Sequence, residues 1–142
     1  MKKNKKNILW VDDKIYSAEM RPDRDELEAG GFNIMPIDSA DMFIEFINSE
    51  KDIDNYVCVI IDLIMPVGNT LDIQKTRRNI DTGLELIKRM KRKFKNAKIV
   101  VYSQLKDSEK AKKYCATKGI PFWEKGDVLP SEFVSKIIEY VG

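Results

Sequence analysis

The sequence predicts a single α/β domain, a doubly wound (βα)5 three-layer sandwich in which a five-stranded parallel sheet lies between two layers of helices. Two observations predict this fold. Five short apolar segments alternate strictly with five segments of helical periodicity, and such alternation is typical of parallel strands joined by right-handed crossovers. The most apolar segment, Tyr56-Val-Cys-Val-Ile-Ile, contains no charged residue and is followed at once by Asp62. A strand of this kind is covered on both faces, as in a sheet between helices.

Each expected element has a local signal in the sequence. The strands are expected in short runs of apolar and β-branched residues: Ile8 to Val11, Phe32 to Ile37, Tyr56 to Asp62, Ala97 to Tyr102 and Ile120 to Glu124. The helices are expected between these runs: about Tyr16 to Ala29, from the cap Asp38 or Ser39 onward, from the cap Asp81 or Thr82 onward, Asp107 to Lys118, and from Pro130 onward. Apolar residues at helical spacing, such as Phe133, Val134, Ile137, Ile138 and Val141, supply the buried face of the last helix.

Composition limits the function classes. The 142 residues, 43% of them hydrophobic, are enough for one domain with a real core, so residues 1–142 are expected to form one unit. Lys and Arg total 25 against 23 Asp and Glu, and this balance gives no global reason to expect nucleic-acid or membrane binding. The chain has no histidine, which excludes Ser-His and Cys-His catalysis and histidine metal sites.

The cysteines and the N-terminus indicate a cytoplasmic protein. Cys58 and Cys115 lie far apart, form no C-x-x-C motif and are expected to be structural thiols in a reducing compartment. The basic start resembles the first part of a signal peptide, but only four apolar residues follow it before two aspartates. The basic run Lys88 to Lys95 is expected to be the solvated side of an amphipathic helix.

Five polar residues lie at or just past the ends of predicted strands. They are Asp12-Asp13, Asp62, Ser103 and Lys125. Because parallel strands end at the same edge of a sheet, these side chains are expected to meet there. Clustered carboxylates repel one another unless a cation neutralises them, and hard oxygen ligands suit Mg²⁺. A phosphoryl group brought to Asp62 would lie between this metal, the lysine ammonium and the serine hydroxyl, which favours attack by the carboxylate on phosphorus.

Five motifs, in order, resemble the response-regulator receiver domains of two-component signalling. They are Ile8-Leu-Trp-Val-Asp-Asp13, Val59-Ile-Ile-Asp-Leu-Ile-Met-Pro66, Gly83-Leu-Glu-Leu86, Val100-Val-Tyr-Ser103 and Phe122-Trp-Glu-Lys125. The resemblance covers essentially the whole chain. It implies a flavodoxin-like sheet in the order 2-1-3-4-5 and a cytoplasmic phosphoprotein of a phosphorelay, with no separate substrate to turn over.

The resemblance also implies a role for each site residue. Asp62 would accept a phosphoryl group from a histidine kinase, a phosphotransfer protein or a small phosphodonor. Magnesium would bind Asp12, Asp13, Asp62 and the backbone carbonyl of Ile64. Lys125 and Ser103 would bind the phosphoryl oxygens, and Ser103 with the aromatic Phe122 would form the switch that changes a surface read by an effector protein. Such a domain would be a monomer or weak homodimer without direct nucleic-acid or membrane contact.

The sequence departs from the receiver pattern at several positions. Residues about 67–80 form a long insertion between the third strand and the third helix, expected to overhang the site, and they include a basic tract at Lys75, Arg77 and Arg78. Gln104 stands where a small residue is typical, and Gly126 stands where proline is usual. Phe122 lacks a hydroxyl, so a switch there would work by packing alone.

Two other functions compete with the phosphoacceptor. The departures at Gln104, at Gly126 and in the insertion favour a degenerate receiver that binds partners constitutively. A phosphohydrolase with an aspartyl nucleophile, similar to the haloacid dehalogenases, would need a second acid two residues after Asp62, where Ile64 stands. Taken one at a time, the site residues have ordinary explanations, since Asp12-Asp13 could cap a turn and Lys125 could be a solvated charge. Their expected meeting at one sheet edge is what favours a site.

Overall fold

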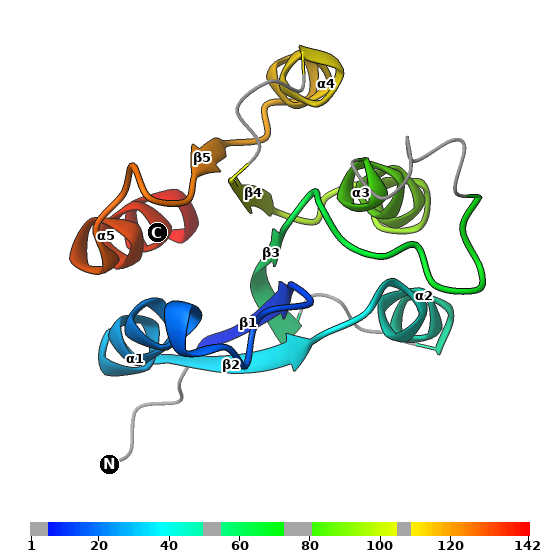
Figure 1. Ribbon diagram of the computed structural model, residues 1–142. Coiled ribbons are helices and arrows are strands. Elements are labelled where there is room, and N and C mark those ends of the chain that lie inside the picture. The colour runs from blue at the N-terminus through cyan, green and yellow to red at the C-terminus, as the bar shows by residue number, and fades with distance from the viewer. Residues whose placement is uncertain (1–5, 50–54, 73–80, 105–108) are drawn as a thin grey trace.

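The computed structural model describes residues 6–49, 55–72, 81–104 and 109–142, in which five strands alternate with five α-helices (Figure 1). The strands are β1 (Lys6–Val11), β2 (Phe32–Ile37), β3 (Tyr56–Ile61), β4 (Ile99–Ser103) and β5 (Phe122–Glu124). The helices are α1 (Arg21–Ala29), preceded by the 3₁₀ helix η1 (Ala18–Met20), α2 (Ala40–Ser49), α3 (Thr82–Lys93), α4 (Glu109–Lys118) and α5 (Pro130–Val141).

The strands form one parallel sheet in the order β2-β1-β3-β4-β5, which confirms the predicted fold and strand order. The register places Val11 beside Ile61, Ile61 beside Val101, and Val101 beside Phe122. The chain first winds outward from β1 to β2 and then returns across β1 to β3. Ligands of open α/β sheets bind at the carboxyl ends of the strands where the winding reverses, here between β1 and β3.

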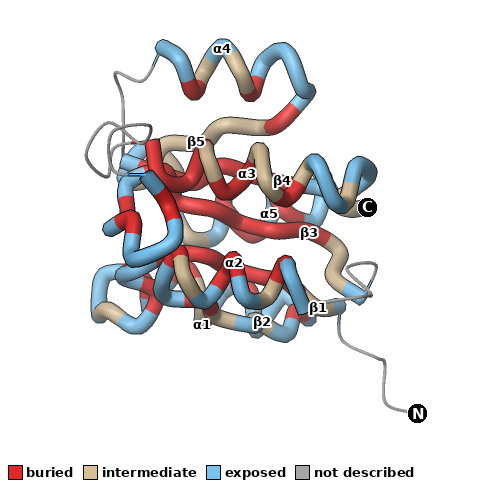
Figure 2. Tube along the Cα trace, turned by 90° about the vertical axis from the view of Figure 1, so that its right-hand side faces the viewer, coloured by how far each residue is buried: buried red, intermediate tan, exposed pale blue. Residues whose placement is uncertain are grey.

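Helices cover both faces of the sheet. Figure 1 shows α1 and α5 on one face and α2, α3 and α4 on the other. Strand side chains alternate between two cores: Leu9 and Val11 of β1 pack beneath α2 and α3, while Ile8 and Trp10 pack beneath α1 and α5. The inner parts of the strands are buried on both sides (Figure 2). This two-sided burial explains why the strand sequences are almost continuously apolar.

The first helix begins later than predicted. The sequence pattern placed its start near Tyr16, but α1 begins at Arg21 and η1 precedes it. Pro22 accounts for the difference, because it lacks the N–H that an α-helix already under way would need there. In the first turn of α1 this missing donor costs nothing.

The last helix has a narrower buried face than predicted. Phe133, Val134 and Ile137 are buried, whereas Ile138 is 48% exposed. Consecutive helical residues point about 100° apart, so a face centred on Phe133 and Ile137 leaves Ile138 at its edge.

The described part of the predicted insertion packs against α2 instead of overhanging the sheet edge. Val67 and Leu71 are buried in the core beneath α2 and α3. Between them, the N–H groups of Asn69 and Thr70 donate hydrogen bonds to the Asp41 carboxylate in the first turn of α2. The basic tract at Lys75, Arg77 and Arg78 lies outside the described residues.

Both cysteines are buried and unpaired, as expected of structural thiols. Burial raises the pKa of Cys58 to about 12 and that of Cys115 to about 11. Among the described residues, no helix is long and apolar enough to cross a membrane.

Candidate functional site

Backbone hydrogen bonds continue past the ends of the strands and fix the site residues in place. The Asp12 N–H donates to the Ile37 carbonyl at 2.9 Å, and the Asp62 N–H donates to the Val11 carbonyl at 3.0 Å. On the other side of the site, the Lys125 N–H donates to the Ser103 carbonyl at 2.9 Å. The site residues are therefore held by the sheet itself rather than by free loops.

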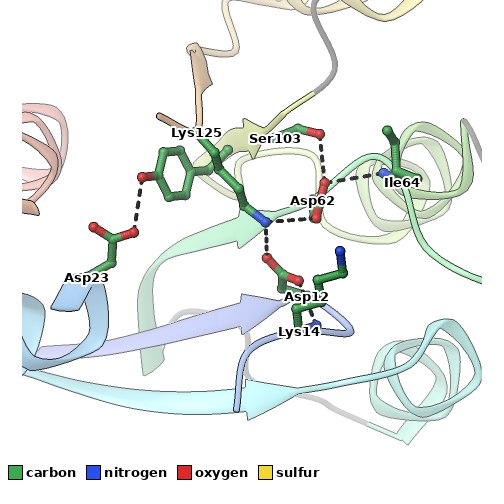
Figure 3. A network of polar contacts seen from close by, with 8 residues as sticks. Asp12, Lys14, Asp23, Asp62, Ile64, Ser103 and Lys125 are labelled. Atoms are coloured by element: carbon green, nitrogen blue, oxygen red, sulfur yellow. Dashed lines mark hydrogen bonds and ion pairs between the residues drawn. The ribbon is translucent and has the colours of Figure 1, made fainter. Parts of the chain in front are cut away.

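The side chains of these residues converge on Asp62 (Figure 3). The Lys125 ammonium lies 2.6 Å from Asp12 Oδ2 and 2.9 Å from Asp62 Oδ2. The Ser103 hydroxyl donates to Asp62 Oδ1 at 2.7 Å, and the Ile64 N–H approaches the same oxygen at 3.3 Å. Both carboxylate oxygens of Asp62 thus have a donor.

Burial strengthens the electrostatics of the cluster. Asp12 is fully buried and the Lys125 side chain is 9% exposed. Burial, and then the neighbouring charge of Asp62, raises the pKa of Asp12 above its usual value. Burial alone would lower the pKa of Lys125, but Asp62 and Asp12 together raise it above its usual value. The ammonium therefore stays charged and partly compensates the buried carboxylates.

Asp13 completes an acidic group that suits a divalent cation. One carboxylate oxygen from each of Asp12, Asp13 and Asp62 lies within 4.8 Å of the others, and Asp13 is exposed. Partial desolvation of its carboxyl, and then the charge of Asp62, raise the pKa of Asp13. Lys125 is the cation in contact with Asp12 and Asp62, and a second positive charge would relieve the remaining repulsion. Hard oxygen donors with an open, solvated side fit Mg²⁺.

A pocket of about 500 Å³ opens beside Asp62. Asp62 is 6% exposed and lines this pocket together with Asp13 and Lys125. The rest of the wall is mixed in polarity, and its apolar residues come from the segments after β1, β3 and β5. These residues include Met20, Pro22, Ile64, Met65, Pro66, Val128 and Pro130. A donor molecule can therefore approach Asp62 from this side.

The far wall of the pocket contains a buried acid that sequence reasoning missed. The Tyr102 hydroxyl donates to the Asp23 carboxylate at 3.1 Å, joining β4 to the first turn of α1. Burial raises the pKa of Asp23, whereas this hydrogen bond lowers it. Tyr102 also stacks on Phe133 of α5, with ring centroids 4.3 Å apart. One sequence signal for this pair was available. Tyr102 directly precedes Ser103, and neighbouring residues of a strand face opposite sides of the sheet.

The first residues of α3 hold the backbone that follows Asp62 in place. The Gly83 N–H donates to the Leu63 carbonyl at 2.9 Å, and the Thr82 hydroxyl donates to the Met65 carbonyl. A methyl group at Gly83 would collide with the carbonyl oxygen of Asp62. Glycine at this position therefore lets α3 pack directly against the backbone that carries Asp62.

The two departures next to the site have structural consequences. Gln104 is exposed and lines the same pocket as Asp62, so its side chain borders the approach to that carboxylate. Gly126 has a φ of 90°, which proline, with φ fixed near −65°, cannot adopt. The backbone after Lys125 thus differs from the proline-containing pattern, yet Lys125 still contacts both buried aspartates.

The structure brings together the five predicted side chains Asp12, Asp13, Asp62, Ser103 and Lys125. Phe122 does not join them. It is half-buried on β5 and packs against the core on the α3 and α4 side, with the Lys112 ammonium 5.9 Å from its ring centroid.

Comparison with solved structures identifies the fold. A CheY-like response regulator receiver domain protein from Methanospirillum hungatei JF-1 superimposes with a TM-score of 0.71 at 20% identity, covering 96% of this chain and 94% of that chain. The non-phosphorylated HemR receiver domain from Leptospira biflexa gives 0.70 at 19% identity, covering 97% and 95%. The chain has the receiver fold.

The BeF3-activated DrrB receiver domain is also similar to this chain, with a TM-score of 0.66 at 12% identity and coverage of 96% and 97%. No protein-family model matches the sequence, and no curated protein matches it either. At these identities the likeness establishes the receiver fold, and the function has to be argued from the site.

Proposed function

We propose that residues 1–142 form a phosphoacceptor receiver domain in which Asp62 accepts a phosphoryl group from a histidine kinase, a phosphotransfer protein or a small phosphodonor. The observation that carries the proposal is the convergence of Ser103, Lys125 and two further aspartates on Asp62 at the edge of a receiver-fold sheet. The product is an aspartyl phosphate, and the domain has no separate substrate to turn over.

Transfer forms one bond and breaks one. A carboxylate oxygen of Asp62 attacks phosphorus, while the bond from phosphorus to the donor nitrogen or oxygen breaks and the donor keeps that electron pair. The Lys125 ammonium bridges Asp12 and Asp62, and the Ser103 hydroxyl donates to Asp62. Both donors can shift to the phosphoryl oxygens. The carboxylate lone pair needed for attack is thereby released.

The metal of this proposal is Mg²⁺. Asp12, Asp13, Asp62 and the Ile64 backbone carbonyl would hold it. When bound, it supplies positive charge that offsets the charge on the phosphoryl oxygens.

The proposed output is a change in a protein-binding surface. Ser103 ends β4, whose Val101 pairs with Phe122 of β5, so a hydroxyl drawn toward a phosphoryl group would move the strand next to Phe122. The reader of this surface is a downstream effector protein. We propose a cytoplasmic monomer or weak homodimer, with no direct contact to nucleic acid or membrane.

Acetyl phosphate with Mg²⁺ tests the proposal. The wild-type chain should gain the mass of one phosphoryl group, and the adduct should be lost on acid or base treatment. The variant Asp62→Asn, which keeps the size of the side chain, should gain none. An unmodified wild-type chain, or equal modification of both proteins, would refute the proposal.

A second candidate is a degenerate receiver that binds its partner constitutively. The features that favour it are the exposed Gln104 beside Asp62 and the unusual backbone at Gly126. Beryllofluoride, which mimics a phosphoryl group on a carboxylate, distinguishes the two. Tight Mg²⁺-dependent binding of beryllofluoride supports the phosphoacceptor and counts against the degenerate receiver.

A further inference from the structure

A basic groove lies between the end of α3 and the end of α4, away from Asp62. Its volume is about 640 Å³, within the range of about 300–1,000 Å³ typical of small-molecule sites. Five of its six lining residues are cations and the sixth is Tyr114. The cations are Lys88, Lys91, Arg92, Lys95 and Lys118. No carboxylate is among the described residues that line it.

Helix ends explain only part of this charge. Lys91, Arg92 and Lys118 occupy the last turns of α3 and α4, where cations complement the partial negative charge of a helix C-terminus. That effect does not account for Lys95, which lies beyond the end of α3. It also does not account for two helices directing their terminal cations into one concave surface.

Within the described ranges, Glu85 is the acid that forms an ion pair with one of these cations. Glu85 pairs with Lys88 at 3.7 Å, and the Lys88 ammonium also lies 5.6 Å from the Tyr114 ring centroid. Lys91 donates to the Ala97 carbonyl at 2.8 Å and more weakly to the Lys95 carbonyl at 3.4 Å, which leaves one of its three N–H groups for a ligand.

The positive charge of the groove affects the pKa of the half-buried Lys91. Burial, and then repulsion by Lys118, lowers the pKa of Lys91 below its usual value. An anion bound in the groove would remove this repulsion.

We propose that this groove binds a small ligand carrying several phosphate groups, such as a polyphosphate or a multiply phosphorylated ester. Lysine ammoniums act as point charges for phosphate, and Arg92 adds a planar donor pair on the same wall. Tyr114 is the one aromatic among the described residues that line the groove, so cations supply nearly all of its side chains. The proposal is independent of phosphorylation at Asp62.

Tripolyphosphate in metal-free buffer is the probe, because without Mg²⁺ it has no metal through which to occupy the Asp62 site. Calorimetry should give one molecule bound per chain, and the amide signals that shift in an NMR titration should be those at the ends of α3 and α4. The double variant Arg92→Gln/Lys118→Gln removes one exposed cation from each wall and should weaken binding at least tenfold.

The matched control is Lys110→Gln/Lys113→Gln, which removes the same charge from exposed positions of α4 outside the groove. It should change the affinity less than twofold. Equal weakening in both double variants, or no binding at millimolar tripolyphosphate, would overturn the proposal. Tighter binding of a short DNA duplex or a polyglutamate peptide would also overturn it, since the natural occupant would then be a macromolecule.

Discussion

At the scale of single residues, the hydrogen bond between Tyr102 and Asp23 leads to a prediction about stability. The buried Asp23 carboxylate accepts this bond from a neutral donor, the Tyr102 hydroxyl. Both residues are buried, and the hydroxyl donates across 3.1 Å. Replacing Tyr102 with Phe removes the donor and keeps the ring that stacks on Phe133. We expect a loss of about 1–2 kcal/mol in the free energy of unfolding at pH 7, measured by urea denaturation. An unchanged stability would show that water replaces the hydroxyl at no cost.

The same pair predicts a pH dependence. The pKa of Asp23 is raised in the folded chain, chiefly by burial, above the usual 3.8. The folded state therefore holds this proton more tightly than the unfolded state, and Asp23 costs stability as pH rises from about 4 through its folded pKa. Relative to wild type, Asp23→Asn should gain stability between about pH 4 and pH 7. A difference that stays constant with pH would contradict the raised pKa.

Residue identities predicted much of the site but not this pair. Asp12, Asp13, Asp62, Ser103 and Lys125 could be predicted because each directly follows an apolar strand, and parallel strands end together. Asp23 has no such signal, since an acid in the first turn of a helix is ordinary. The packing of α1 against the sheet determines that Asp23 meets Tyr102. The local sequence pattern around Asp23 carries no information on that packing.

Among elements, α3 shows how helix packing positions the phosphoacceptor. Its second residue, Gly83, leaves no room for a Cβ beside the Asp62 carbonyl. We expect Gly83→Ala to cost roughly 1–3 kcal/mol of stability, because α3 or the backbone at Asp62 must shift. The yield of phosphoryl adduct from acetyl phosphate should fall as well.

Gly119→Ala is the control for this substitution. Gly119 has a φ of 70° and open space around it, so alanine there costs about 1 kcal/mol from backbone conformation alone. Its phosphoryl adduct should form as in wild type. Loss of the adduct in both variants would mean that general destabilisation, and not the packing of α3, controls Asp62.

The elements that the sequence misjudged have local physical causes. The start of α1 moved to Arg21 because Pro22 is compatible only with a first turn. Residues 67–72 fold onto α2 because Val67 and Leu71 are buried in the core beneath it. Between them, the N–H groups of Asn69 and Thr70 donate to the Asp41 carboxylate. A long polar-looking segment gives no sign of which helix it will meet, so the expectation that it overhangs the site was wrong for these residues.

At the scale of the whole molecule, the buried acidic cluster links metal binding to stability. The Lys125 ammonium pairs with two of the three clustered carboxylates, those of Asp12 and Asp62, and a bound divalent cation would reduce the repulsion that remains. At a Mg²⁺ concentration ten times its dissociation constant we expect about 1.4 kcal/mol of added stability. For a chain of this length that corresponds to a rise of about 3–6 °C in Tm.

Two measurements check the magnesium effect. Thermal unfolding should show the rise in wild type and a much smaller one in Asp13→Asn, which removes the exposed ligand. Alkylation of Cys58 and Cys115 should slow on adding Mg²⁺, because both thiols are buried and react only when the chain opens. Equal stabilisation of both proteins would place the cation elsewhere.

The central claim is that Asp62 itself becomes phosphorylated, and site mapping tests it most directly. After incubation with acetyl phosphate and Mg²⁺, borohydride reduces an acyl phosphate and converts the modified aspartate to homoserine, which peptide mass spectrometry locates. The account predicts homoserine at position 62, dependent on Mg²⁺ and strongly reduced in Lys125→Gln. Homoserine at another position, or none in the wild-type chain, would contradict it.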